Sequence, residues 1–216
     1  MRYPKIRNEF VIKVLIYLLS SMFKNSLKIS KISYLLSLIV IIAITSKAIA
    51  IEPLSFPFNS DSGKYWRYTS DQVMGGVSEG QVILEQDEGM YYARLTGNVS
   101  TKNYGGFIQL RTGISFANSE QGGKNLQGVR LNVRGNGETY DFHIVTNDRA
   151  YYGDFYSATF EADSEWEMIE LPFNTFKRKG YNTSKLDAKN IRSIAIVAYG
   201  RDFISDVSVS TVEFYY

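Results

Sequence analysis

The 216-residue sequence contains no cysteine and a single histidine, His143. Without thiols the chain forms no disulfide and offers neither a thiolate metal site nor a cysteine nucleophile. One imidazole is too few for a metal centre, which usually gathers three or four ligands. Nucleotide motifs are also missing, since no GxGxxG opens a helix and no Lys-Ser/Thr follows a glycine-rich loop. We therefore expect no cofactor and no metal, and a fold held together by its hydrophobic core.

The first 50 residues have the composition of a secretory signal. They contain eight basic side chains and one acidic side chain, and residues 32–46 form an uncharged apolar stretch. A basic start, a short apolar centre and a small-residue end predict a helical signal segment that is cleaved after Ala50. A second apolar run at residues 10–19 leaves two alternatives: translation begins at Met22, or both runs anchor the chain. Because a membrane span needs about 20 residues, we expect no stable span after processing.

Residues 51–216 form one predicted domain whose charge differs from that of the whole chain. They contain 16 basic and 21 acidic side chains, a formal net charge of −5. A net-acidic domain is a poor candidate for nucleic-acid binding, where Lys and Arg must displace counterions from phosphates. The one dense basic run, residues 177–179, is interpreted as a solvated loop. We expect an exported protein in the periplasm, the extracellular space or a lumen.

The predicted domain has the hydrophobic pattern of short β-strands. Apolar and polar residues alternate over residues 81–95 around a polar turn, which predicts a hairpin with one buried face. Residues 129–133 alternate similarly, and Gly135-Asn136-Gly137 followed by residues 140–146 predicts a second hairpin. No window has the pattern of a long amphipathic helix. The fold class is therefore all-β, an antiparallel sandwich.

Three further segments refine this prediction. Residues 194–199 are apolar on both faces, as expected for a central strand. The apolar period shifts between Val209 and Val212, which predicts a bulge or bend. The best helical candidate is short and lies around residues 184–190.

Two paired-glycine strings stand out, DQVMGGVSEG at Asp71–Gly80 and NYGGF at Asn103–Phe107. Paired glycines between polar residues indicate backbone bends where a Cβ does not fit. Such bends either line a binding edge with free amides or allow two loops to cross closely, with Asp71 and Ser78 capping a turn. The candidate binding residues in these strings are Asp71, Gly75, Gly76, Ser78, Asn103, Gly105 and Gly106.

These strings belong to a longer pattern that resembles the complex I intermediate-associated protein 30 family. The matching residues are Trp66, Asp71, Met74-Gly75-Gly76-Val77-Ser78, Asn103-x-Gly105-Gly106-Phe107, Arg111, Val133-Arg134-Gly135-x-Gly137, Tyr140, Trp166, Leu171-Pro172-Phe173 and Phe176. The resemblance implies a galactose-binding-like β-sandwich, a jelly roll, over nearly all of residues 51–216. It also implies a non-enzymatic role, since mitochondrial members assist assembly of respiratory complex I. This chain departs from those members because it carries an export signal instead of a transit peptide.

Two arginines and the histidine are the remaining charged candidates. Arg111 and Arg134 each lie on a strand beside a glycine turn, where a guanidinium can bind a ligand carboxylate or pair internally with Asp71 or Glu79. Asp141 shares a strand face with His143. A catalytic pair needs a nucleophile or substrate beside it, and no GxSxG motif supplies one. Cleavage of envelope glycans by this pair is therefore the weakest functional alternative.

The aromatic run at residues 151–156 supports a second functional class. Exposed rings such as Tyr151 and Tyr152 can stack on sugars, while Asp154 can accept hydrogen bonds from sugar hydroxyls; alternatively, half of the rings face the core. Trp166, Phe173 and Phe176 are predicted to lie in the core. The leading prediction is an exported, non-enzymatic module that binds a protein partner during assembly or maintenance of an envelope complex. The alternative is a carbohydrate-binding domain with a glycan as its partner.

Overall fold

The computed structural model describes residues 13, 17, 54–114, 116, 125–180 and 184–216. It divides the chain into two units, Met1–Ala50 and Ile51–Tyr216. In the first unit only Lys13 and Tyr17 are described, and both are helical and exposed. The predicted signal segment and its cleavage site otherwise lie outside the described residues. No helix in the described part of the chain has the length and hydropathy of a membrane span.

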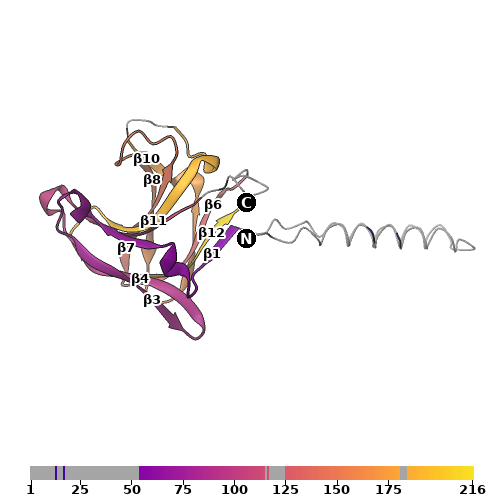
Figure 1. The fold of residues 1–216 in the computed structure, drawn as a ribbon, viewed down its shortest axis with the longest axis horizontal. Helices are drawn as coiled ribbons and strands as arrows, with labels where there is room; N and C mark the ends of the chain where they lie inside the picture. Colours follow the sequence, from indigo (N-terminus) through magenta and orange to yellow (C-terminus); the bar gives the residue numbers. More distant parts are fainter. Residues whose placement is uncertain (1–12, 14–16, 18–53, 115, 117–124, 181–183) are drawn as a thin grey trace, which may run out of the picture. The chain divides into compact units, whose positions relative to one another are not determined.

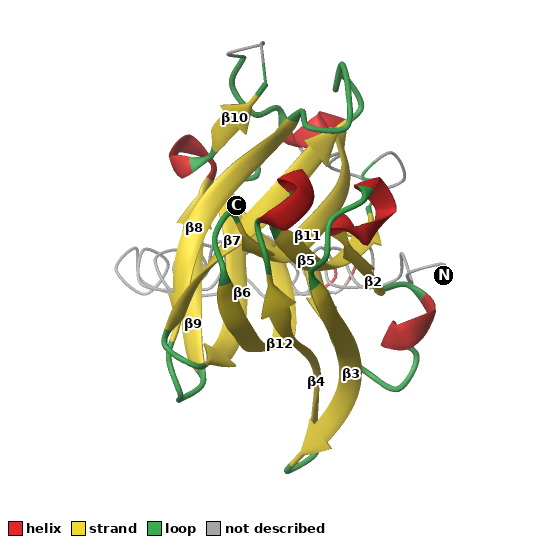
Figure 2. Ribbon diagram, turned by 90° about the vertical axis from the view of Figure 1, so that its left-hand side faces the viewer, coloured by secondary structure: helices red, strands yellow, loops and turns green. Residues whose placement is uncertain are grey.

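The second unit is a sandwich of two antiparallel sheets, which confirms the predicted all-β class (Figures 1 and 2). Sheet A has the spatial order β3 (Glu79–Asp87), β4 (Met90–Val99), β12 (Phe203–Tyr215), β6 (Gly128–Gly135) and β9 (Glu167–Pro172), and β1 (Leu54–Pro57) also pairs with β12. Sheet B has the order β10 (Lys177–Lys179), β8 (Phe155–Ala162), β7 (Glu138–Thr146), β11 (Ile191–Tyr199), β5 (Phe107–Gly113) and β2 (Arg67–Ser70). Short 3-10 turns lie between strands: η1 (Ser62–Lys64), η2 (Asp71–Met74), η3 (Lys102–Tyr104), η4 (Phe173–Thr175) and η5 (Ala188–Asn190).

Alternation along each strand decides which side chains enter the core between the sheets. On β5, Ile108 and Leu110 are completely buried, whereas Phe107, Gln109 and Arg111 lie on the opposite face and are partly exposed. β7 and β11 follow the same rule and bury their even-numbered apolar residues in the core. Because successive strand residues point to opposite faces, the odd-numbered residues of sheet B form a second, outer face. That outer face carries the candidate site.

Several details of the strand prediction are confirmed. β3 and β4 form the predicted hairpin, and Glu88 and Gly89 at its tip both have positive φ, as a tight hairpin turn requires. β11 lies between β7 and β5 and is buried along most of its length. The register of β12 against β6 shifts between Val209 and Thr211, where the bulge was expected.

The second predicted hairpin is wrong. β6 pairs with β12 and β9 in sheet A, whereas β7 pairs with β11 and β8 in sheet B. The turn between them crosses from one sheet to the other, and its Gly135 and Gly137 amides donate to the carbonyls of Asp163 and Ala162 at 2.5 and 2.8 Å. Alternation is a local signal that both strands share with any half-buried strand, so it does not identify the strand with which each one pairs.

Three smaller predictions also need correction. The expected helix around residues 184–190 is limited to the turn η5. Residues 177–179 are not a solvated loop, because they form the edge strand β10 and the side chain of Arg178 is buried. Phe176 is buried and Phe173 packs against the core as predicted. Trp166 is only partly buried and instead contacts Tyr92, with ring centroids 5.4 Å apart.

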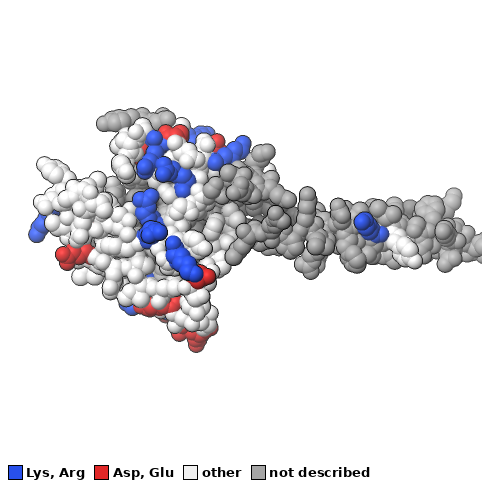
Figure 3. All heavy atoms as spheres, in the orientation of Figure 1, with Lys and Arg blue, Asp and Glu red and all other residues white. Residues whose placement is uncertain are grey.

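The surface of the second unit carries charges of both signs. Figure 3 shows Lys and Arg side chains in an interrupted row on the face turned toward the viewer, with several Asp and Glu side chains nearer its edges. The net charge of −5 for residues 51–216 is therefore unevenly distributed.

Candidate functional site

The two glycine pairs meet around the carboxylate of Asp71, which is completely buried. Asp71 accepts hydrogen bonds from the backbone N and Oγ of Ser78, at 2.9 and 2.5 Å, and from the amides of Gly106 and Phe107, at 2.5 and 3.2 Å. Burial raises the pKa of Asp71, but the hydrogen bonds from Gly106, Ser78 and Phe107 outweigh it, so the pKa lies below its ordinary value. The carboxylate thus ties the loop of the first string to the loop of the second.

Glycine is needed at this crossing because there is no room for a side chain. A Cβ at Gly76 or at Gly105 would overlap with the side chain of Asp71. Gly75 and Gly106 have φ of +92° and +124°, backbone conformations that residues with a side chain rarely adopt. Asn103 adds a 3.4 Å hydrogen bond from its side-chain amide to the carbonyl of Gly75. Of the two alternatives left open by the sequence, these contacts match the close crossing of two loops.

The crossing holds two loops at the rim of a groove of about 300 Å³ on the outer face of sheet B. Strand residues form its floor: Thr69 on β2; Phe107, Gln109 and Arg111 on β5; His143 and Val145 on β7; Phe155 on β8; and Ser193, Ile194, Ala195, Val197 and Tyr199 on β11. Loop residues form its walls: Val73, Met74, Tyr104, Gly105, Arg149, Tyr152 and Gly153. Of the predicted candidates, Gly105, Arg111 and Tyr152 line this groove.

Aromatic rings are the main feature of the groove. Tyr104, Tyr152 and Tyr199 are 102, 84 and 40% exposed. Tyr104 also has a φ of +59°, a left-handed conformation that is uncommon for residues other than glycine. Phe155 stacks on His143 at the floor, with ring centroids 4.1 Å apart and planes at 23°. The groove thus presents apolar ring surface to solvent at both its floor and its walls.

His143 lines the groove floor, whereas Asp141 is not part of the groove lining and contacts three side chains, including His143. Its Oδ2 is 3.4 Å from His143 Nε2 and accepts from Ser157 Oγ at 2.8 Å, while its Oδ1 accepts from Thr159 Oγ1 at 2.9 Å. Burial lowers the pKa of His143 although Asp141 acts to raise it, which favours the neutral imidazole. Burial raises the pKa of Asp141, but hydrogen bonds from His143, Ser157 and Thr159 bring it below its ordinary value. The Asp141 carboxylate lies between Ser157 and His143 and contacts both. In a catalytic triad the serine is instead hydrogen-bonded directly to the histidine that acts as its base.

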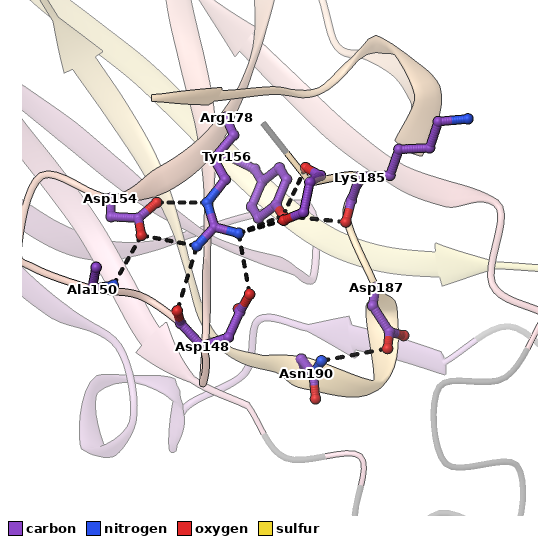
Figure 4. A network of polar contacts seen from close by, with 9 residues as sticks. Asp148, Ala150, Asp154, Tyr156, Arg178, Lys185, Asp187 and Asn190 are labelled. Atoms are coloured by element: carbon purple, nitrogen blue, oxygen red, sulfur yellow. Dashed lines mark hydrogen bonds and ion pairs between the residues drawn. The ribbon is translucent and has the colours of Figure 1, made fainter. Parts of the chain in front are cut away.

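The aromatic run at residues 151–156 divides between the groove and the core. Tyr152 lines the groove and Tyr151, 43% exposed, lies on the same loop, whereas Tyr156 is buried. Asp154, predicted to accept from a ligand, is buried and binds Arg178 instead, at 2.7 Å from Nε and 2.8 Å from Nη2 (Figure 4). The Arg178 side chain lowers the pKa of Asp154 to about 2.

Arg178 connects β10 to the loop that carries Tyr152. Its guanidinium also contacts Asp148 Oδ2, the Tyr156 hydroxyl and Ser184 Oγ, and Asp154 accepts from the amide of Ala150 at 2.9 Å (Figure 4). The sequence interpretation missed this anchor because it treated residues 177–179 as a run of charge. An internal partner for Arg178 depends on the pairing of β10 with β8, which places Arg178 opposite Tyr156.

The two arginines predicted as binding candidates lie on different sheets. Arg111 lies in the groove floor, while Arg134 lies on β6 of sheet A and is not part of the groove lining. Arg134 stacks over the rings of Trp166 and Tyr92, 4.8 and 5.0 Å from their centroids. Neither arginine forms the predicted ion pair with Asp71 or Glu79 among the described residues.

The sequence reasoning did not name several groove residues as candidates, among them Met74, Tyr104, Phe107 and Tyr199. One sequence feature could have indicated Phe107 and Tyr199 as groove residues. Each is an aromatic residue at an outward position of a strand whose other face is apolar. The same pattern is also expected for a strand that is buried on both faces, so it does not identify a groove by itself.

The comparison with protein families decides the relationship of the chain. The chain matches the family described as Complex I intermediate-associated protein 30 (CIA30) over residues 56–206. The chain belongs to this family. The CIA30 match begins in β1 and ends within β12, so it includes the glycine crossing and the groove. None of the curated protein sequences is significantly similar to this CIA30-family chain.

Solved structures similar to this CIA30-family chain include carbohydrate-binding modules. The family 11 module of the cellulosomal cellulase Lic26A-Cel5E of Clostridium thermocellum has a TM-score of 0.60 at 15% identity, covering 77% of this chain and 95% of that one. A family 11 module from Clostridium thermocellum in complex with a β-1,3-1,4-mixed-linked tetrasaccharide has a TM-score of 0.56 at 16% identity, covering 74% and 95%. At these identities the likeness concerns the fold, and it confirms the predicted galactose-binding-like sandwich.

Proposed function

We propose that this chain is an exported, non-enzymatic binding module that holds a glycan in the groove over sheet B. The observation that carries the proposal is the set of exposed rings around one groove, Tyr104, Tyr152 and Tyr199. An exposed tyrosine offers an apolar face for the C–H surface of a sugar and a hydroxyl for hydrogen bonding. The predicted export signal would bring such a groove to glycans outside the cytoplasm.

The groove chemistry favours binding over cleavage. Glycoside hydrolysis uses two carboxylic side chains that flank the scissile bond. Among the described residues that line the groove, none is Asp or Glu. The adjacent Asp141 accepts hydrogen bonds from Ser157 and Thr159 and contacts His143, so its oxygens are engaged within the protein.

Two features support a functional role for Tyr104. Its side chain is fully exposed, although burying an aromatic ring is favourable, and its backbone adopts the left-handed conformation. Backbone strain of this kind persists where the surroundings enforce it and gathers at ligand-binding sites. At Tyr104 the surroundings are the loop crossing at the buried Asp71. The amides of Gly106 and Phe107, which follow Tyr104 closely in the sequence, donate hydrogen bonds to the Asp71 carboxylate.

The second candidate function is binding of a protein partner in complex assembly, which the family description favours. In that case the exposed apolar residues at the rim, including Val73 and Met74 at 76 and 61% exposure, would be the contact surface. The glycan proposal is preferred because a concave site lined by rings suits a small ligand or a sugar chain better than it suits a flat protein surface.

Titration calorimetry against a panel of soluble oligosaccharides tests the proposal. We expect Y104A, Y152A and Y199A each to weaken binding about tenfold, which corresponds to about 1.4 kcal/mol. Tyr65, 67% exposed and outside the groove lining, supplies the matched control Y65A, which should leave affinity unchanged. Absence of binding to every oligosaccharide, or equal losses in Y65A and Y152A, would refute the proposal. A partner protein that Y104A and Y152A release would establish the second candidate instead.

A further inference from the structure

The groove has an unusual charge balance for an acidic domain. Its lining includes two arginines, Arg111 in the floor and Arg149 in the wall, and among the described lining residues there is no Asp or Glu. Residues 51–216 nevertheless carry more acidic than basic side chains, 21 against 16. Positive charge is therefore concentrated where the proposed ligand would bind.

Neither groove arginine has an acidic partner among the described residues. Most other described arginines do: Arg94 pairs with Asp206, Arg130 with Glu170, Arg178 with Asp154 and Arg201 with Glu138. Arg149 only stacks over the ring of Tyr152, 4.8 Å from its centroid. Arg111 makes neither an ion pair nor a side-chain hydrogen bond within the described part of the chain. The guanidinium donors of both residues are thus available to a ligand.

A second arginine, Arg67, lies next to Arg111 on the neighbouring strand. Arg67 on β2 lies directly opposite Arg111 in the antiparallel register, so the two side chains share the outer face of sheet B. Like charges in directly opposed positions destabilise a sheet. Arg67 is exposed and has no acidic partner among the described residues either. An anion bound at this end of the groove would relieve the repulsion, whereas a neutral ligand would leave it in place.

Two ionised carboxylates lie near the groove, those of Asp71 and Asp141, and neither forms an ion pair with a groove arginine. Asp71 is completely buried and bound by four hydrogen bonds. Asp141 is engaged by Ser157, Thr159 and His143. His143 is held in its neutral form by burial, so it adds no fixed charge of its own.

We infer that the groove binds an acidic glycan, whose sugar carboxylates are recognised by Arg111 and Arg149 while the rings of the groove stack on the sugars. This inference rests on the proposed glycan-binding function and specifies its ligand class. A guanidinium binds a carboxylate through two parallel hydrogen bonds, which a lysine cannot reproduce. Arg149 lies on the ring of Tyr152, so one sugar residue can contact the ring and the charge together.

Calorimetry with three oligosaccharides of equal length tests the inference: a uronic-acid oligomer, a neutral β-glucan oligomer and a sulfated oligomer. We expect the uronic-acid oligomer to bind at least tenfold more tightly than the neutral one, with an advantage that decreases as salt screens the charges. R111Q and R149Q should each remove about tenfold of the affinity, and R111K should recover only part of it. R130Q on sheet A makes the same change in net charge outside the groove and should leave the affinity within twofold. Thermal unfolding of each variant checks that the fold is kept.

The outcomes separate this inference from the function on which it rests. Equal binding of the neutral and uronic-acid oligomers, sensitive to Y152A but not to R111Q, would overturn the acidic ligand and keep the glycan-binding function. Tighter binding of the sulfated oligomer than of the uronic-acid oligomer would overturn the carboxylate assignment. No binding of any of the three oligomers, with the fold intact, would refute both.

Discussion

Replacing Asp154 by asparagine tests whether the buried pair with Arg178 anchors the groove loop. Both side chains are only 2% exposed, so solvent screens their interaction little. The Arg178 side chain lowers the pKa of Asp154 from 3.8 to about 2. Since each unit of pKa corresponds to about 1.4 kcal/mol, ionised Asp154 stabilises the fold by about 2 kcal/mol at neutral pH. The amide of D154N resembles the protonated carboxyl, so D154N should lose this amount.

The loss has a defined pH dependence. The pKa of Asp154 is lower in the folded than in the unfolded chain, so its contribution is complete above about pH 4 and disappears as the pH falls toward about 2. Denaturant titrations of wild type and D154N should therefore differ by about 2 kcal/mol at pH 7 and converge at low pH. For a domain of this size the thermal midpoint should fall by about 4–8 °C.

A control and a second measurement complete this test. Glu170 forms a 2.7 Å ion pair with Arg130 but is 54% exposed, so E170Q should cost less than about 1 kcal/mol. D154N should also weaken ligand binding, because Asp154 accepts from Ala150 on the loop that carries Arg149 and Tyr152. If D154N lies within about 0.5 kcal/mol of wild type, or if its deficit is unchanged near pH 3, the anchor argument is wrong.

Three further predictions concern other parts of the chain. G76A should destabilise the fold by about 1–3 kcal/mol in denaturant titrations, because its Cβ would overlap with Asp71, whereas G63A, with open space around the Cβ, should be close to neutral. Burial lowers the pKa of His143 in the fold, so stability should decrease as the pH falls below about 6.5, and H143Q should flatten this slope; an unchanged slope between pH 5 and 7 would contradict it. Sequencing of the exported protein should find Ile51 at its N-terminus, and any other start contradicts cleavage after Ala50.

The amount of structure that the sequence predicts depends on how local each signal is. The β3–β4 hairpin needs only alternation and a turn at Glu88-Gly89, and it was predicted correctly. The pairing of β6 depends on strands far away in sequence, β9 and β12, and it was predicted wrongly. The turn at Gly135–Gly137 is compatible with either outcome, because a glycine turn can close a hairpin or cross between sheets.

The candidate site follows the same division. Tyr152 and Arg111 were identified from composition and position, and both line the groove. Asp154 was interpreted as a ligand-binding carboxylate because nothing in the local sequence announces Arg178, 24 residues later. Tyr104 and Tyr199 were missed because an outward-facing aromatic is not distinguished, in one sequence, from an aromatic in the core.

The sequence by itself determined the all-strand class and the absence of thiol chemistry, since the first follows from local alternation and the second from composition. Only the tertiary structure decided which face of sheet B stays open and which arginines remain unpaired. Sheet order and register place residues from β2, β5, β7, β8 and β11 around one groove, while the same order brings Arg178 to Asp154. Charge pairing and ring exposure depend on these long-range contacts, which alternation along a single strand does not encode.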